Sequence, residues 1–144
     1  MTPDINVLVA AFRSDHPRHQ VARGWLAQAR ASCVAGEASL RILPMVLAGF
    51  LRLVTNAKVF AEPDSIDDAL AFALALLGTG GAELPTCGDE WPLFREKLRQ
   101  HALAGNAVPD AWIAACVEHL GEHLVTFDRD FRHLLHPKSH TLLA

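Results

Sequence analysis

The segment Gly105–Phe131, GNAVPDAWIAACVEHLGEHLVTFDRDF, contains the two patterns that decide the fold. Pro109 suits the first turn of a helix, where its missing N–H costs no hydrogen bond, and Gly121 suits a helix end. The segment therefore predicts a helix from Pro109 to Gly121. The short apolar stretch from His123 to Phe127 then predicts a buried strand. A helix that leads directly into a buried strand favours an α/β fold.

Acidic side chains stand at the ends of these two elements. Asp110 lies in the first turn of the predicted helix, on the face of Ile113 and Val117, so its carboxylate borders the buried stripe. Asp128 and Asp130 directly follow the strand. Ligands of open α/β sheets bind at the C-terminal ends of strands, and a nearby helix N-terminus stabilises carboxylates. An aspartate at either position is also common as a helix cap or turn residue without any functional role. The functional hypothesis therefore requires that these acids lie close to a third acid in the fold.

The rest of the chain alternates short apolar stretches with amphipathic ones. Near the N-terminus, Asp4 stands ahead of an apolar run that predicts a short strand entering a turn or helix, and Asp4 and Asn6 would share a face if this segment is extended. Further helices are expected at 13–32, 44–56, 65–77 and 88–104, and further short strands within 33–43, 82–84 and 141–143. This alternation predicts a single domain, residues 1–144, with a three-layer α/β sandwich: a central, mostly parallel sheet with helices on both faces.

Composition narrows the classes of function. The 144 residues are 51% hydrophobic and 20% charged. They contain no apolar run long enough to span a bilayer, and no signal peptide is recognised at Met1, so we expect a cytoplasmic protein. The three cysteines are widely spaced and odd in number, and we expect them to be reduced and structural. The net charge of −3 argues against non-specific wrapping of nucleic acid, so a nucleic-acid function would need a local basic patch.

In an α/β sandwich Asp4, Asp110 and Asp128 could all reach one edge of the sheet. Three close carboxylates repel one another, and a cation would neutralise that repulsion. Oxygen ligands suit Mg²⁺ or Mn²⁺ better than zinc, and no set of Cys and His residues has a credible zinc spacing. A cation held by carboxylates activates a water molecule and stabilises charge on phosphate oxygens, so the predicted chemistry is phosphodiester hydrolysis.

Three short motifs carry a resemblance to a known family. Asp4-Ile5-Asn6, the run GNAVPDA at 105–111 and the run VTFDRDF at 125–131 closely resemble the PIN-domain ribonucleases, in particular the VapC toxins of bacterial toxin–antitoxin pairs. The run LAGFLRLVTN at 47–56 is also similar, so the resemblance covers nearly the whole chain. It implies a PIN fold, a Mg²⁺- or Mn²⁺-dependent endoribonuclease that cleaves RNA, and an inhibitory VapB-like antitoxin. A homodimer is also expected.

The resemblance assigns roles residue by residue. Asp4, Asp110 and Asp128 match the acidic site and are the expected catalytic residues and metal ligands, whereas Asn6, Thr126 and Asp130 match its supporting positions. The family usually carries a glutamate where this chain has Gly49. Either Asp130 or water fills that gap, or metal binding and activity are weaker than in relatives; we expect an active variant. The glycine predicts a water-filled space beside the cation, about the size of a side chain.

RNA beside so many acids requires positive charge, and Arg13, Arg52 and Arg129 are the expected contacts, although Arg129 could equally pair with a neighbouring carboxylate. Two other classes of function remain. A PIN-like module could hold RNA or a protein without cleaving. A phospho-acceptor receiver domain also collects aspartates at strand ends, but it needs a lysine after a late strand. The nearest one, Lys138, lies in a proline-containing loop, which disfavours the receiver.

Overall fold

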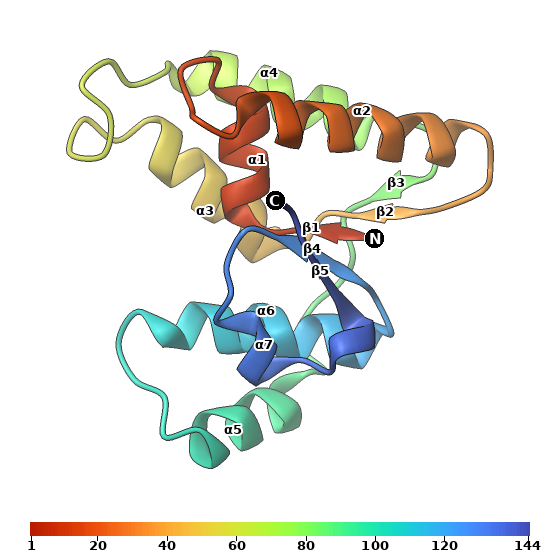
Figure 1. The fold of residues 1–144 in the computed structure, drawn as a ribbon, viewed down its shortest axis with the longest axis vertical. Coiled ribbons are helices and arrows are strands. Elements are labelled where there is room, and N and C mark those ends of the chain that lie inside the picture. Colours follow the sequence, from red (N-terminus) through yellow and green to blue (C-terminus); the bar gives the residue numbers. More distant parts are fainter.

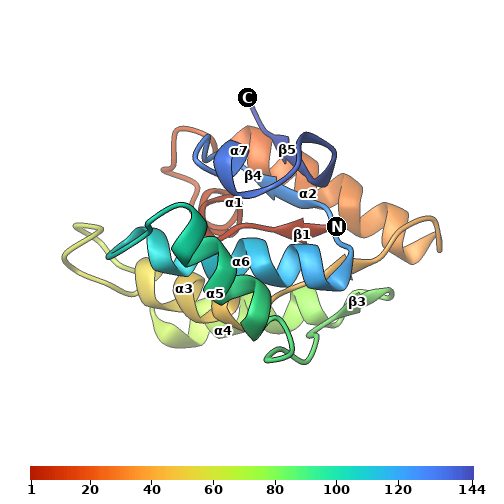
Figure 2. The ribbon, with the colours of Figure 1, turned by 90° about the horizontal axis from the view of Figure 1, so that it is seen from below.

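The computed structural model describes residues 1–144 and places a parallel sheet between two groups of helices (Figure 1). Helices α1 to α4 lie on one side of the strands and α5 to α7 on the other; seen from below, α5 lies in front of α6, with β1 visible beside α6 (Figure 2). In chain order the elements are β1 (Thr2–Pro3), α1 (Ile5–Phe12), α2 (His19–Val34), β2 (Leu40–Arg41), α3 (Pro44–Val54), α4 (Ile66–Leu77), β3 (Ala82–Glu83), α5 (Trp91–Gln100), α6 (Ala107–Leu120), β4 (Leu124–Thr126), α7 (Phe131–Leu134), the short 3₁₀ helix η1 (Pro137–Ser139) and β5 (His140–Leu142).

Every strand pair is parallel. β4 lies between β1 and β5, and β2 pairs with β3. The two sheets adjoin at the N-terminus, where the Arg41 N–H donates to the Met1 carbonyl at 2.9 Å. The predicted three-layer sandwich with a parallel sheet is therefore confirmed. Its strands have only two or three residues each, so packed helices supply most of the buried surface.

The core follows the apolar faces of the helices. α1 packs against α2 and α3, α4 packs on α3, and α5 packs on α6. Among the largest fully buried side chains are Leu8 of α1, Phe50 of α3 and Ile113 of α6. Helix α6 begins near the predicted Pro109 and is capped by Gly121 in the left-handed conformation, at φ 65°, which glycine adopts without steric cost. No helix is long and apolar enough to cross a membrane.

The N-terminal part differs from the sequence prediction. Asp4 and Asn6 do not share the face of a strand: Asp4 caps α1, its Oδ1 accepting from the Ile5 N–H at 2.7 Å, and Asn6 lies inside that helix. The next helix begins at His19 rather than at Arg13, with Pro17 in the turn before it. It continues to Val34, and the short strand expected within 33–43 is found at Leu40–Arg41. The effect is that Asp4 stands at a helix start directly after β1.

Candidate active site

Hydrogen bonds around Asp4 join the start of α1 to the end of β4. The Thr126 hydroxyl donates to Asp4 Oδ2 at 2.6 Å, and Asn6 Nδ2 donates to the same oxygen at 2.9 Å. Asn6 Nδ2 also lies 3.2 Å from Thr126 Oγ1, and its Oδ1 accepts from the Phe127 N–H at 3.2 Å. Thr126 is fully buried and Asp4 is 4% exposed. Asn6 and Thr126 thus fix the orientation of the Asp4 carboxylate.

The same threonine positions the second acid. The Asp128 N–H donates to Thr126 Oγ1 at 2.9 Å, and Asp128 Oδ1 accepts from the Asp130 N–H at 2.8 Å. These bonds form a turn that directs the chain away from β4 just where the strand ends. Asp128 is half-buried and Asp130 is exposed.

Asp110 lies in the first turn of α6, across from these residues, and is half-buried. Burial, reinforced by the negative charges of Asp4, Asp128 and Asp130, raises the pKa of Asp110 to about 6. Burial also raises the pKa of Asp4 above its ordinary value, with a further contribution from Asp128 and against the lowering effect of its hydrogen bonds. The negative charge of Asp128 therefore acts on both Asp4 and Asp110 and disfavours the ionisation of each.

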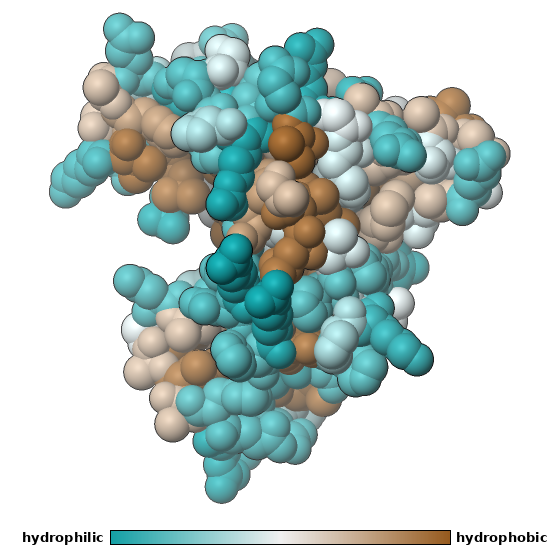
Figure 3. Space-filling model, in the orientation of Figure 1, coloured by the Kyte–Doolittle hydropathy of each residue, from teal (hydrophilic) through white to brown (hydrophobic).

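Asp4, Asp110 and Asp128 line one pocket of about 390 Å³. Its other walls are largely apolar and include Ile5, Leu53 and Phe60. In Figure 3 the surface is hollowed between the loop that follows α3 and the beginning of α6. The structure thus brings together the three acids that the sequence analysis selected, from the start of α1, the start of α6 and the end of β4.

A second pocket, of about 440 Å³, adjoins the first one and shares Asn6, His16 and Asp128 with it. Arg18 and Arg129 also line it, and the Arg18 guanidinium lies 4.7 Å above the Phe127 ring. Sequence reasoning missed His16 and Arg18 because it assigned their segment to a helix start. In the structure the segment forms a turn beside the acids and supplies positive charge there.

Of the three arginines expected to contact RNA, Arg13 is a wrong prediction. Its side chain is buried, its Nη1 donates to Asp64 Oδ2 at 2.8 Å, and its Nη2 lies 2.6 Å from Asp15 Oδ2. The guanidinium also stacks 3.8 Å from the centre of the Phe60 ring. Arg13 therefore holds the loop after α3 in place and has no exposed charge to offer. Arg52 and Arg129 are exposed and remain candidates.

The water-filled space expected at Gly49 is also absent. Gly49 is buried in α3, and a Cβ built on it would lie 3.0 Å from Ile5 Cγ1 and closer still to Ile5 Cδ1. Such contacts are tighter than real Cβ atoms normally make, so hydrocarbon from α1 fills the position. The sequence could not indicate this because Ile5 and Gly49 are far apart in the chain.

A family model described as "PIN domain" matches residues 1–135. This chain belongs to the PIN-domain family. Ribonuclease VapC25 of Mycobacterium tuberculosis is 38% identical over 131 residues, and the match covers 89% of this chain and 88% of the relative. Ribonuclease VapC31 of the same species is 37% identical over 132 residues, covering 89% and 88%. The crystal structure of VapBC2 from Rickettsia felis bound to a promoter DNA fragment aligns with a TM-score of 0.67 at 19% identity, covering 99% and 98% of the two chains.

The donor atoms in this PIN-domain pocket are suited to a hard divalent cation. Its three acids provide carboxylate oxygens, the ligands that Mg²⁺ and Mn²⁺ prefer. Burial raises the pKa of Asp110, and so do the neighbouring negative charges that a cation would neutralise. The ligand oxygens of these acids do not all lie within 4.8 Å of one another. A cation held by them would take water molecules as further ligands, as Mg²⁺ usually does in proteins.

Proposed function

We propose that this protein is an endoribonuclease that hydrolyses RNA phosphodiester bonds with Mg²⁺ or Mn²⁺, and that Asp4, Asp110 and Asp128 are its catalytic residues and metal ligands. The observation that carries the proposal is the meeting of these acids in one pocket, together with the raised pKa of Asp110. The names of the relatives, VapC ribonucleases, support RNA as the substrate.

The acids of the pocket and its apolar walls have separate parts in the proposed reaction. A divalent cation bound there would lower the pKa of its bound water molecule and stabilise negative charge on the phosphate oxygens. Asp4 is held rigidly by Thr126 and Asn6, so its free electron pairs face a fixed direction. Asp128 is fixed by its turn, and Asp130 adds negative charge near Asp110. Apolar walls at Ile5, Leu53 and Phe60 limit water and strengthen the local electrostatics.

The RNA backbone would approach through the adjoining pocket. Arg18 and Arg129 line it beside Asp128, and their guanidinium groups are suited to bidentate contacts with phosphate. Arg52 on α3 is a third exposed candidate. The whole chain has a net charge of −3, which disfavours RNA binding. The arginines beside the pocket provide the local positive charge that binding requires.

We further propose that the protein is the toxin of a toxin–antitoxin pair and is inhibited by a VapB-like antitoxin. The relatives are named VapC, and the structural neighbour is VapBC2. A homodimer and a cytoplasmic location belong to the same proposal. A short antitoxin reading frame immediately upstream of the gene would support the pairing, and co-purification of its product with this chain would test it.

The central experiment is an RNA cleavage assay with purified protein, with chelator and with Mg²⁺ or Mn²⁺ added. Cleavage should require the metal and be abolished in Asp110→Asn and Asp128→Asn, because the amide keeps the size of the side chain and removes the charge that holds the cation. Asp67→Asn is the matched control: Asp67 also lies in the first turn of a helix, α4, but it is exposed and outside both pockets.

The assay also separates the proposal from its alternative, a PIN-like module that binds without cleaving. Folded wild-type protein that binds RNA with no metal-dependent turnover would establish the binding module. Full activity in either Asn variant would show that its aspartate serves only as a cap or turn residue.

A further inference from the structure

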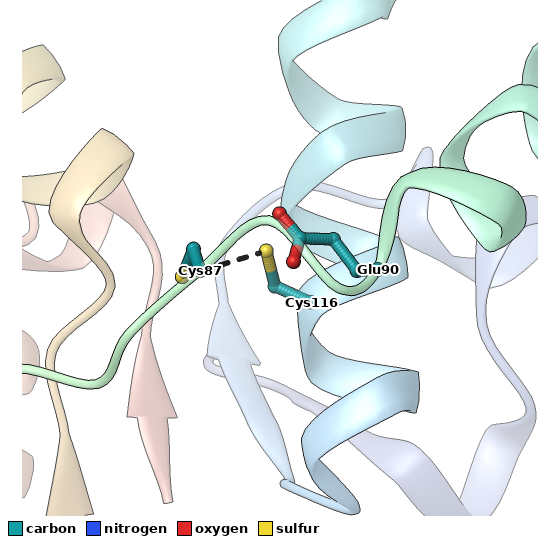
Figure 4. A group of neighbouring side chains, drawn as sticks. All are labelled: Cys87, Glu90 and Cys116. Carbon is teal, nitrogen blue, oxygen red and sulfur yellow. Dashed lines mark hydrogen bonds between the residues drawn. The ribbon is translucent and has the colours of Figure 1, made fainter.

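Two cysteines and a glutamate converge outside the acidic pocket. Cys87 and Glu90 belong to the segment between β3 and α5, whereas Cys116 projects from α6, and the three side chains point toward one another (Figure 4). The Cys87 and Cys116 sulfurs are 4.0 Å apart, and one ligand atom from each of the three residues lies within 4.8 Å of the others. Nothing in the sequence indicated this cluster, since residues 87 and 116 lie in separate elements with no motif spacing.

The Glu90 carboxylate is unusual for a buried charge. Glu90 is 2% exposed, and none of the ion pairs of this chain includes it. Its Oε1 accepts from Trp112 Nε1–H and its Oε2 from the Gly88 N–H, both at 2.6 Å. Burial acts to raise the pKa of Glu90, but these hydrogen bonds hold it below its ordinary value. A buried, ionised carboxylate without a cation thus faces two thiols.

We propose that Cys87, Glu90 and Cys116 form a second metal site, which takes a thiophilic divalent cation such as Zn²⁺. A tetrahedral zinc ion with Zn–S bonds of about 2.3 Å holds two thiolate sulfurs about 3.8 Å apart, close to the separation found here. The hydrogen bonds from Trp112 and Gly88 orient the carboxylate as outer partners orient metal ligands. Cys87 is partly exposed, which leaves a route for the ion and a water molecule as the fourth ligand.

Charge balance favours a cation here. Binding releases one proton from each thiol to solvent, and the two new thiolates carry as much negative charge as the divalent ion carries positive charge. The buried cluster therefore keeps the single negative charge that Glu90 already gives it, and the ion adds direct bonds at no extra cost in buried charge.

The same geometry could close a disulfide, but the chemistry of the cluster opposes it. Disulfide exchange requires a thiolate, and burial together with Glu90 raises the pKa of both thiols. A metal ion overcomes this barrier because it replaces the protons directly. The ion would join the segment before α5 to α6, the helix that carries Asp110, and so stabilise the half of the pocket that α6 supplies.

The test uses the reduced full chain, without metal, titrated with Cd²⁺ and followed by thiolate-to-cadmium charge-transfer absorption in the ultraviolet. The acidic pocket has no thiol and is silent in this measurement. We expect a charge-transfer band that saturates at one ion per chain, is displaced by Zn²⁺, and accompanies a rise in melting temperature. Cys87→Ser and Cys116→Ser should lose most of the band, whereas Cys33→Ser, which changes the one cysteine outside the cluster, should keep it.

Two further variants probe the carboxylate and its support. Glu90→Gln should weaken cadmium binding while both thiols remain, and Trp112→Phe should lower affinity about 10- to 100-fold, as loss of an outer hydrogen bond to a ligand does elsewhere. Absence of the band in folded wild-type protein would overturn the proposal, as would a band that survives loss of either cysteine. Rapid formation of a Cys87–Cys116 disulfide in protein that takes up no metal would replace the metal site with a redox pair.

Discussion

The side chain of Ile5 in α1 lies against Gly49 in α3 and occupies the space that a side chain at residue 49 would take. This contact lets α1 and α3 approach closely beside the acidic pocket, which Ile5 itself lines. Hydrocarbon therefore fills the place where the sequence led us to expect a water-filled space, and the pocket contains three acids, Asp4, Asp110 and Asp128.

Gly49→Ala should destabilise the protein by about 1–3 kcal/mol, the usual cost of overpacking a core, although alanine is the better helix former. Ile5→Ala in the same chain should recover most of the loss, since it removes the atoms that the new methyl group meets. Gly24→Ala is the control, because Gly24 lies inside α2 with no atom near a new Cβ, and it should stabilise by about 0.5–1 kcal/mol. Urea unfolding of the wild type and each variant measures these differences.

An additive result for Gly49→Ala and Ile5→Ala would show that the two residues do not compete for space. A related pair of variants tests metal affinity. The Gly49→Glu protein should be less stable than wild type, whereas the double variant Gly49→Glu, Ile5→Ala has room for the glutamate. Calorimetry should show that this double variant binds Mn²⁺ more tightly than wild type does. This corrects the sequence-based expectation of a water-filled space at Gly49.

The sequence predicted those parts of the site that local patterns determine. Pro109 and Gly121 mark the ends of a helix, and the apolar run before Asp128 marks a strand, so local patterns alone assign two of the acids to element ends. Contacts between distant segments could not be predicted. Arg13 pairs with Asp64, 51 residues away, and no local pattern distinguishes that arginine from one that faces RNA.

Thr126→Val should destabilise the protein by about 1–3 kcal/mol, because the lost hydroxyl donates to Asp4 and accepts from the Asp128 N–H in a fully buried place. Thr2→Val is a closely matched control. Thr2 is also fully buried in a parallel strand, but its hydroxyl has no hydrogen-bond partner, so valine there should be neutral or stabilising. Equal losses in the two variants, by thermal unfolding, would rule out a special role for the Thr126 hydroxyl.

Arg18→Gln and Arg129→Gln should weaken RNA binding and flatten its dependence on salt, each by about 0.7 in the slope of log K against log salt if one phosphate contact is lost. Binding is best measured with the inactive Asp128→Asn protein to prevent cleavage. Arg95→Gln is the control, since Arg95 is an exposed arginine on the outer helix α5. Arg13→Gln should instead lower the melting temperature, because the buried guanidinium loses its ion pairs with Asp15 and Asp64. An unchanged slope in the first two variants would exclude these arginines from phosphate contact.

The pH dependence of stability should reveal the burial of Asp110 and the acids around it. Its folded-state pKa of about 6 exceeds the ordinary 3.8, so the folded protein binds this proton more tightly than the unfolded chain does. The resulting stabilisation is fully present below about pH 3.8 and is lost as the pH rises through about 6.

Other carboxyl groups also titrate in this range, so the informative quantity is the difference in stability between wild type and Asp110→Asn. In chelator, the variant should gain stability relative to wild type between about pH 4 and pH 7. At neutral pH, Mn²⁺ should raise the melting temperature of wild type and raise that of the variant less, because the cation neutralises the charge that asparagine has already removed. If the difference between the two proteins does not change with pH, Asp110 is ionised at no cost, and the acids do not share the field that the structure implies.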